Sequence, residues 1–245
     1  MSGPPGPAAV GRLAAVLLDF DDTLTDHARV EQEAWECVAT LVTARLPHVD
    51  GAALRVRYHE GFERHYRRML DGEIDFRQYR RQRLAEALAP WHDLDDDLFA
   101  AYTDAKNRTI DGASLWPDAM ATIERLRRAG LGVGVLTNGP SEIQRRKLRA
   151  TGVEAAVDAV LVSEELGVAK PDVRAFALAA AALGTRPSCT AMVGDSLLND
   201  VAGGLAAGCA PVVWIARQDG EAPPGAVRAA GLTEAGDVVL AGLAS

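Results

Sequence analysis

The feature that most constrains this chain is an apolar run that ends on three closely spaced carboxylates. Residues 14–18 read AAVLL, and the next five residues read DFDDT. A short continuous apolar run predicts a buried strand of a parallel sheet. Because side chains alternate along a strand, we expect Asp19 and Asp21 to point the same way and to converge at one strand end. Like charges this close need a cation, a shared proton or both.

A simpler interpretation is that Asp21, Asp22 and Thr23 only cap the following turn, as these residue types often do. Three other polar segments argue against it, because each also lies at the end of an apolar run. These segments are LTNG at 136–139, AKPD at 169–172 and VGDSLLND at 193–200.

Composition narrows the class of protein. The chain has 245 residues, of which 48% are hydrophobic, enough for one large buried core or two smaller ones. A formal net charge of -8 and a pI near 5.2 argue against nucleic-acid polymers and anionic membranes as partners, because both require a cationic surface. Cys37, Cys189 and Cys209 form no CxxC pair, so they indicate neither a disulfide framework nor a zinc site, and a reducing cytoplasm fits best.

The ends and the apolar runs of the sequence indicate no membrane segment. Residues 1–11 are rich in proline, glycine and alanine and predict a flexible tail, not a signal peptide. The longest apolar run, residues 175–183, is far shorter than the roughly 20 residues that cross a bilayer. We therefore expect a cytoplasmic protein without a membrane partner, either a monomer or a homodimer.

Residues 26–115 differ in character from the rest of the chain. They are rich in arginine and glutamate, and strand-like runs are missing from them. The segments with the apolar spacing of helices are 30–46, 52–70, 76–88 and 97–110. The pattern predicts an all-helical cap domain at 26–115, inserted into an α/β core domain at 12–25 and 116–245.

In the predicted core, short apolar strands alternate with helices. The later strands are expected at 132–137, 157–162, 190–193 and 211–215. Such alternation predicts right-handed crossovers and a parallel sheet covered on both faces, a three-layer Rossmann-like α/β fold. Ligands of such sheets bind beyond the carboxyl ends of the strands, so Asp19, Thr137 and Asp195 are expected at one edge. The insertion leaves the same edge after Asp26 and is placed to cover it.

The segments DFDDTLTD, LTNG, VAKPD and GDSLLND, in this order, resemble the four motifs of the haloacid dehalogenase superfamily. The similarity extends from residue 14 to about residue 215. The stretch SEELGVAKPD and the position of the helical insertion resemble the phosphatase branch, which includes nucleoside-monophosphate and sugar-phosphate phosphatases. The resemblance implies a magnesium-dependent phosphatase of a small phosphorylated metabolite.

Asp19 and Asp21 carry the expected chemistry. A phosphate monoester dianion repels an attacking anion, so a carboxylate nucleophile needs a bridging cation. Asp19 is the expected nucleophile and would form an aspartyl-phosphate. Asp21 would protonate the leaving oxygen and later deprotonate water. As the family implies, the backbone carbonyl of Asp21 would also bind the metal.

The remaining motif residues suit a magnesium and phosphate site. Asp195 would complete the Mg²⁺ site with Asp19 and Asp21, because this ion prefers oxygen ligands. Asp200 would bind the ion through water or hold a coordinated group. An equally good interpretation is that Asp200 is an acidic residue at the start of a helix, where the helix dipole favours it. Ser196 and Asn199 are interpreted as loop and capping residues.

The second and third motifs are expected to hold the phosphate. Thr137 offers a hydroxyl, and Asn138 and Gly139 offer backbone N–H groups, at a strand-to-helix turn that suits an anion. Lys170 supplies a cation for the phosphate oxygens and for the aspartates. An isolated Lys-Pro pair is ordinarily part of a loop, and only its place in the motif order favours this role.

Within the insertion, several cations can reach or steer an anionic substrate. They are His27, Arg57, His65, Arg68, Arg83 and Lys106. For each of them a solvated helix face is the simpler interpretation. A stripe of aromatic residues is more typical of core packing than of a stacking platform, and it comprises Trp35, Tyr58, Phe62, Tyr66 and Tyr79.

Other functions are compatible with the same fold. By the family's pattern, a dehalogenase and a phosphonate-cleaving enzyme both lack the second carboxylate, so Asp21 speaks against them. A sugar phosphomutase keeps both carboxylates but usually carries glycine at the place of Asp22. A binding or regulatory protein of this fold would be expected to have lost at least one of the acids, and all are present.

Overall fold

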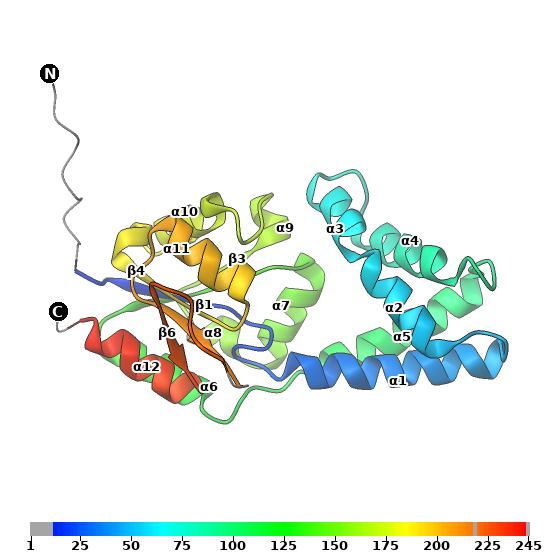
Figure 1. The fold of residues 1–245 in the computed structure, drawn as a ribbon, viewed down its shortest axis with the longest axis horizontal. Coiled ribbons are helices and arrows are strands. Elements are labelled where there is room, and N and C mark those ends of the chain that lie inside the picture. The colour runs from blue at the N-terminus through cyan, green and yellow to red at the C-terminus, as the bar shows by residue number, and fades with distance from the viewer. Residues whose placement is uncertain (1–11, 218–219, 244–245) are drawn as a thin grey trace, which may run out of the picture.

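The protein is described by a computed structural model that covers residues 12–217 and 220–243, so the tail expected at 1–11 lies outside the described residues. Its centre is a parallel sheet of six strands in the order β3-β2-β1-β4-β5-β6 (Figure 1). The strands are β1 (Ala15–Leu18), β2 (Gly132–Thr137), β3 (Ala159–Val162), β4 (Thr190–Gly194), β5 (Val212–Ile215) and β6 (Ala226–Ala229). This is the order of a Rossmann-like fold, and it confirms the predicted α/β class.

Helices cover both faces of the sheet, which makes three layers (Figure 1). The helices of this part are α6 (Ala119–Arg128), α7 (Ser141–Ala150), α8 (Val153–Ala156), α9 (Ser163–Leu166), α10 (Val173–Ala182), α11 (Gly203–Ala207) and α12 (Leu232–Ala241). Side chains alternate along β1, so Val16 and Leu18 pack with α6, α7 and α12, whereas Leu17 packs with α10 on the opposite face. Every residue of β1 is therefore buried, as its unbroken apolar run predicted.

Strand β1 lies between β2 and β4. From β1 the chain adds β2 and β3 on one side of the sheet and then β4, β5 and β6 on the other. Leu18 pairs with Val135 on one side and with Val193 on the other. The loops that follow these three strands therefore begin side by side. Such a switch point is the usual binding crevice of an open parallel sheet.

Residues 27–111 form a separate layer of helices beside the sheet (Figure 1). These are α1 (His27–Arg45), α2 (Gly51–Glu60), α3 (Phe62–Leu70), α4 (Phe76–Leu88) and α5 (Asp96–Asp111). They enclose a hydrophobic cluster of their own, centred on Trp35, Tyr58 and Tyr102. A single helix was expected over 52–70, but the structure divides it at Gly61, a residue type that costs helical stability.

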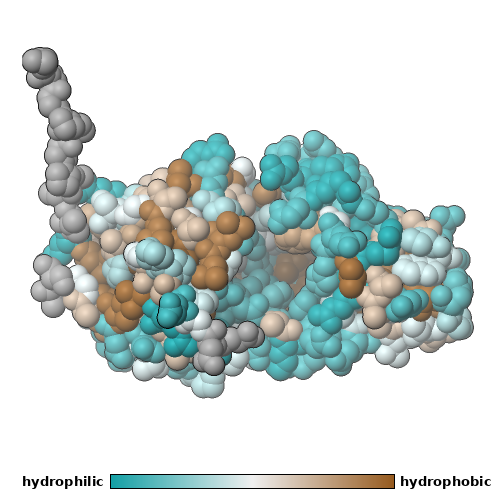
Figure 2. Space-filling model, viewed as in Figure 1, coloured by the Kyte–Doolittle hydropathy of each residue, from teal (hydrophilic) through white to brown (hydrophobic). Residues whose placement is uncertain are grey.

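The two chain segments that join this helical unit to the sheet run antiparallel and are bridged between Thr25 and Leu115. The Trp116 N–H donates to the Leu24 carbonyl at 2.9 Å. Farther out, the Tyr66 hydroxyl of α3 bonds to the Ser163 hydroxyl of α9. Figure 2 shows a hollow between the helical unit and the sheet, and the outer surface of the helical unit is mostly hydrophilic.

Strand β6 and the helix after β4 also differ from the sequence-based expectation. Strand β6 was not predicted, because its sequence, AVRA, is not a continuous apolar run and its Val227 is exposed. The helix whose start was expected at Asp200 begins earlier, with π-helical turns at Leu197–Ala202 that continue into α11. Among the described residues, no helix has both the length and the apolar character needed to cross a membrane.

Candidate active site

Three carboxylates from distant parts of the chain meet at the switch point of the sheet. Asp19 follows β1, Asp195 follows β4, and Asp200 lies in the π-helical turns after β4. One oxygen from each carboxylate lies within 4.8 Å of the other two. The Asp19 N–H also donates to the Val193 carbonyl at 2.9 Å, so the pairing of β1 with β4 itself positions Asp19.

Lys170 joins two of these carboxylates. Its Nζ lies 2.6 Å from Asp19 Oδ1 and 2.6 Å from Asp200 Oδ1, and all three side chains are buried. The other oxygen of Asp200 accepts the Ser196 N–H at 3.0 Å. The close approach of Asp200 also explains Gly194, because a Cβ there would lie 2.3 Å from Asp200 Cγ.

Burial and crowding control the charges of this cluster. Burial raises the pKa of Asp19 well above its usual value, and the neighbouring carboxylates add to the rise although Lys170 opposes it. Burial, together with Asp200, raises the pKa of Asp195 to about 6. For Lys170, burial opposes the charge, but the two bonded carboxylates outweigh it and raise its pKa. The ammonium group therefore stays charged.

The donor set fits a hard divalent cation. If all three carboxylates were ionised, the cluster would carry two negative charges beyond the one ammonium group in a largely buried space. Uncompensated charge of this kind is costly in a protein interior, and Mg²⁺ prefers carboxylate oxygens. The Asp19, Asp195 and Asp200 side chains could hold such an ion, and they include no histidine or cysteine that would favour zinc.

The expected convergence of Asp19 and Asp21 is wrong for the conformation shown. The Asp21 carboxylate contacts α7, where Lys147 Nζ lies 2.6 Å from both of its oxygens and Gln144 Nε2 donates at 3.0 Å. Burial alone would raise the pKa of Asp21, but Lys147 and His27 outweigh burial and lower it to about 2. Strand alternation fails here because β1 ends at Leu18 and the chain turns after Phe20.

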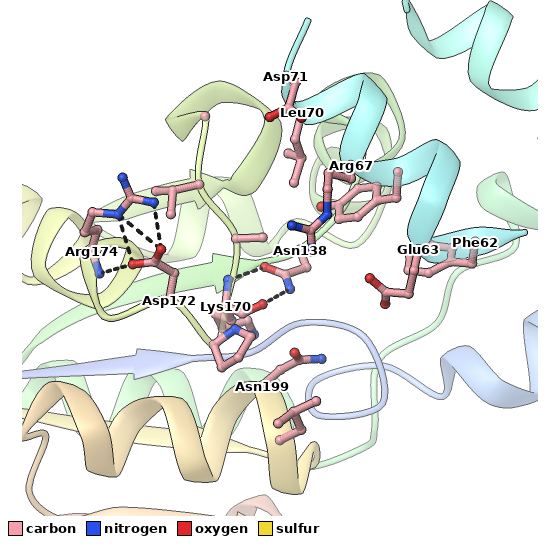
Figure 3. Close-up of a pocket in the computed structure, with 16 residues that line it drawn as sticks. Phe62, Glu63, Arg67, Leu70, Asp71, Asn138, Lys170, Asp172, Arg174 and Asn199 are labelled. Atoms are coloured by element: carbon pink, nitrogen blue, oxygen red, sulfur yellow. Dashed lines mark hydrogen bonds and ion pairs between the residues drawn. The ribbon is translucent and has the colours of Figure 1, made fainter. Parts of the chain in front are cut away.

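The second motif, residues 136–139, lies beside Lys170, and several of its polar groups form hydrogen bonds within the protein. The Asn138 side chain forms two hydrogen bonds, of 2.8 and 2.9 Å, with the backbone of Lys170 (Figure 3). Thr137 Oγ1 accepts a hydrogen bond from Gln144, and the Gly139 N–H donates to Ser163 Oγ at 2.9 Å. In this conformation the Gly139 N–H is therefore used within the protein and does not face an anion freely.

Sequence reasoning missed residues that position the acids. The Thr23 hydroxyl donates to Asp195 Oδ1 at 3.0 Å and accepts the Asp195 N–H, and Trp214 Nε1 donates to the Asp195 carbonyl. Gln144 and Lys147 were missed too, although their i, i+3 spacing on one face of the helix after Thr137 is a usable signal. No comparable signal links Thr23 or Trp214 to Asp195. Ser196 caps the turns at 197–202, as expected, by accepting the Asn199 N–H.

Two cavities, which share Phe62 and Asn138 in their walls, lie between the helical unit and this edge of the sheet. The first has about 630 Å³ and is lined by Asn138, Lys170 and Asn199 from the sheet side. Phe62, Glu63 and Arg67 of α3 lie opposite, as Figure 3 shows.

Three of the six cationic side chains that were considered as substrate contacts in the insertion line the second cavity. His27, Arg83 and Lys106 line it. The other three bond within the helical unit: Arg57 to Ala87, His65 to Glu86 and Arg68 to Glu73. Of the aromatic stripe, Trp35 lies in the core as expected, whereas Tyr58, Phe62 and Tyr79 also line the cavity.

Comparison with known proteins places this arrangement in a family. Residues 13–208 match the haloacid dehalogenase-like hydrolases. The chain belongs to this family of hydrolases. A solved structure of a dehalogenase with an intermediate complex is similar to this chain, with 28% identity, a TM-score of 0.67 and coverage of 91% of this chain and 96% of that chain.

Named relatives of this haloacid dehalogenase-like chain include phosphatases. A phosphoserine phosphatase of Thermus thermophilus is 42% identical over 114 residues, which is 45% of each chain. A ribulose-1,5-bisphosphate 5-phosphatase of Halopiger xanaduensis is 38% identical over 137 residues, 56% of this chain and 54% of that protein. The match thus spans about half the length of these relatives.

Proposed function

We propose that this hydrolase is a magnesium-dependent phosphatase that acts on a small phosphate monoester, either a sugar phosphate or a nucleoside monophosphate. The observation that carries the proposal is the meeting of the Asp19, Asp195 and Asp200 carboxylates within 4.8 Å, with Lys170 bonded to two of them. Phosphatases among the relatives support the same reaction class. Residues 26–115 are proposed to be the cap domain that selects the substrate.

In the proposed reaction, Asp19 attacks phosphorus. A bond forms between Asp19 and phosphorus as the ester P–O bond breaks, and the leaving oxygen takes a proton from Asp21. Water then attacks the phosphoryl group, gives a proton to Asp21 and frees Asp19. Lys170 holds Asp19 in place and offers its charge to the phosphate oxygens.

A magnesium ion would supply positive charge that offsets the repulsion between Asp19 and the phosphate dianion. The residues proposed to hold it are Asp19, Asp195, Asp200 and the backbone carbonyl of Asp21. Asp21 is ionised while it is paired with Lys147, so it must leave Lys147 and gain a proton before it can donate one.

Asp21→Asn is expected to separate the two half-reactions. With 4-nitrophenyl phosphate, whose leaving group needs no proton, the variant should release about one equivalent of nitrophenol rapidly. Turnover should then be slower than in the wild type by roughly 10²-fold or more, since no base activates water. Rapid-mixing absorbance measures both phases. Equal burst and steady-state rates would remove Asp21 from the acid and base role.

Magnesium is expected to stabilise the protein more at pH 8 than at pH 5. Because the folded-state pKa values of Asp19 and Asp195 are raised, the metal-free protein loses stability as the pH rises through about 6. At pH 8 saturating Mg²⁺ should raise Tm by roughly 5 °C or more, and by less at pH 5. Thermal unfolding with Mg²⁺ or with chelator measures this difference.

Asp195→Asn is the control for this experiment, because it removes one proposed ligand and keeps the side-chain shape. It should lose most of the Mg²⁺-dependent shift at pH 8. An equal shift at both pH values, or a full shift in the variant, would contradict the proposed metal site.

The alternative activities make different demands on the site. A dehalogenase attacks carbon and, by the family's pattern, needs no metal, whereas the carboxylate cluster around Asp19 suits a divalent cation. A phosphomutase returns the phosphoryl group to its substrate, whereas a phosphatase releases inorganic phosphate. Magnesium-dependent release of inorganic phosphate therefore separates the proposed function from both, and from a silent binding protein.

A further inference from the structure

The second cavity connects the catalytic edge with the interior of the helical unit. It has a volume of about 340 Å³, which suits a small ligand. Asp21, Asn138 and Lys147 line it from the sheet side, and Arg80 and Arg83 of α4 line it from the helical side. A molecule that fills it can therefore contact Asp21 and Asn138 at one end and two guanidinium groups at the other.

The acids of this cavity are already paired. Asp21 bonds to Lys147 at 2.6 Å, and Glu31 bonds to Lys106 at 2.8 Å. Neither Arg80 nor Arg83 has a carboxylate within 4 Å in residues 12–217 and 220–243. These two arginines therefore give the cavity wall an excess of two positive charges, although the whole chain carries a formal charge of -8.

Arg83 is built into the wall with one donor to spare. Its Nη1 donates to the Tyr79 hydroxyl at 2.6 Å and its Nη2 to the Tyr58 carbonyl at 2.9 Å. Its Nε is buried and has no hydrogen-bond partner among the described residues, and the whole residue is only 6% exposed. A buried charged donor without a partner is costly unless a ligand pairs with it.

Arg80 lies one helical turn away and is also buried in the wall. It is 7% exposed, its Nη1 donates to Asn107 Oδ1 at 2.9 Å, and its guanidinium lies over the Phe76 ring. The ring of Tyr58, 3.8 Å from the Arg83 guanidinium carbon, likewise stabilises positive charge. Aromatic contacts explain how both cations are tolerated, but they supply no negative charge and no acceptor for Arg83 Nε.

We propose that Arg80 and Arg83 bind a second anionic group of the substrate, a carboxylate or a second phosphate, while the phosphoryl group that is removed lies at Asp19. This inference rests on the proposed function and narrows it to phosphorylated acids and bisphosphates. Arginine suits this task because its planar donors match carboxylate and phosphate oxygens. The two arginines act on specificity and do not touch the reacting atoms.

Matched substrate pairs test the inference. In the first pair, 3-phosphoglycerate differs from glycerol 3-phosphate by a carboxylate. In the second, fructose 1,6-bisphosphate differs from fructose 6-phosphate by a phosphate. The kcat/KM of the doubly anionic member should exceed that of its partner by at least about tenfold in one pair. The pair that shows the larger ratio identifies the anionic group.

Variants of α4 locate the effect. Arg80→Gln should reduce this ratio to near one, and Arg80→Lys should restore part of it. Arg81→Gln is the matched control, because Arg81 is the next residue on the helix and pairs with Asp96 instead of lining the cavity. The control should keep the wild-type ratio. Ratios near one in both pairs for a wild-type enzyme that hydrolyses 4-nitrophenyl phosphate would overturn the inference and leave the proposed function intact.

Binding decides the inference even if the protein hydrolyses neither these compounds nor 4-nitrophenyl phosphate, an outcome that would overturn the proposed function and not the anion site. Calorimetry would compare 3-phosphoglycerate with glycerol 3-phosphate, and the bisphosphate with the monophosphate, in the full chain with Mg²⁺. Tighter binding of a doubly anionic compound by at least about tenfold, lost in Arg80→Gln, supports the anion site. Equal affinities within both pairs, or an unchanged preference in Arg80→Gln, overturn it.

Discussion

Asp19→Asn should abolish phosphatase turnover, with kcat reduced by at least about 10⁴-fold. The amide cannot attack phosphorus, and it removes one of the negative charges that would hold the metal. The change is nearly isosteric and removes a buried carboxylate whose pKa is raised, so the metal-free variant should unfold at no lower temperature than the wild type. Release of inorganic phosphate measures the activity, and thermal unfolding shows that the variant is folded.

Asp22→Asn is the matched control for this experiment. Asp22 lies three residues from Asp19 in the same loop, outside the carboxylate cluster, and its Oδ1 accepts the Ala28 N–H. Its backbone has a φ of 60°, which asparagine tolerates well. The control should keep most of the activity. Near-full turnover in Asp19→Asn would end the proposal of a covalent route through Asp19.

Lys170→Met should unfold more easily and lose turnover. The substitution leaves Asp19 and Asp200 buried side by side without their shared cation. Removal of one partner from a buried charge network costs about 3–5 kcal/mol of unfolding free energy. The pKa values of Asp19 and Asp195 are raised in the folded protein, so the loss should be largest at pH 8 and should shrink toward pH 5. Urea unfolding without Mg²⁺ measures it.

A double variant shows whether uncompensated charge is the cause. Lys170→Met combined with Asp200→Asn removes one of the two stranded carboxylates, so it should recover part of the lost stability at pH 8. No recovery would mean that the lysine stabilises the fold by packing. A loss below about 1 kcal/mol in the single variant would show that the ion pairs of Lys170 contribute little to the fold.

Local sequence patterns predicted most of the core. The unbroken apolar run of β1 predicted a strand buried on both faces, and the alternation of strands and helices predicted a parallel sheet. Because a parallel sheet brings the ends of its strands to one edge, the same reasoning anticipated that Asp19 and Asp195 would lie near each other. Strand β6 was missed because its sequence, AVRA, contains no continuous apolar run.

The direction of individual side chains was harder to predict. Asp21 was expected to face Asp19, but it pairs with Lys147, 126 residues away in the chain. Thr23 bonds to Asp195 across 172 residues. In both cases the bonding partner depends on which strands lie next to each other and on the rotation of the following helix or turn. The spacing of residues within one segment reveals neither of these.

By itself, the sequence determined the class of fold, the order of the motifs and the residues proposed to carry the chemistry, because these depend on patterns within short segments. Only the tertiary structure decided that Asp200 shares Lys170 with Asp19, that Asp21 is held apart by α7, and that Arg80 joins Arg83 on a cavity wall. The physical reason is that a charge is satisfied by whichever group packing brings near it. That neighbour follows from how strands and helices assemble and not from the identity of adjacent residues.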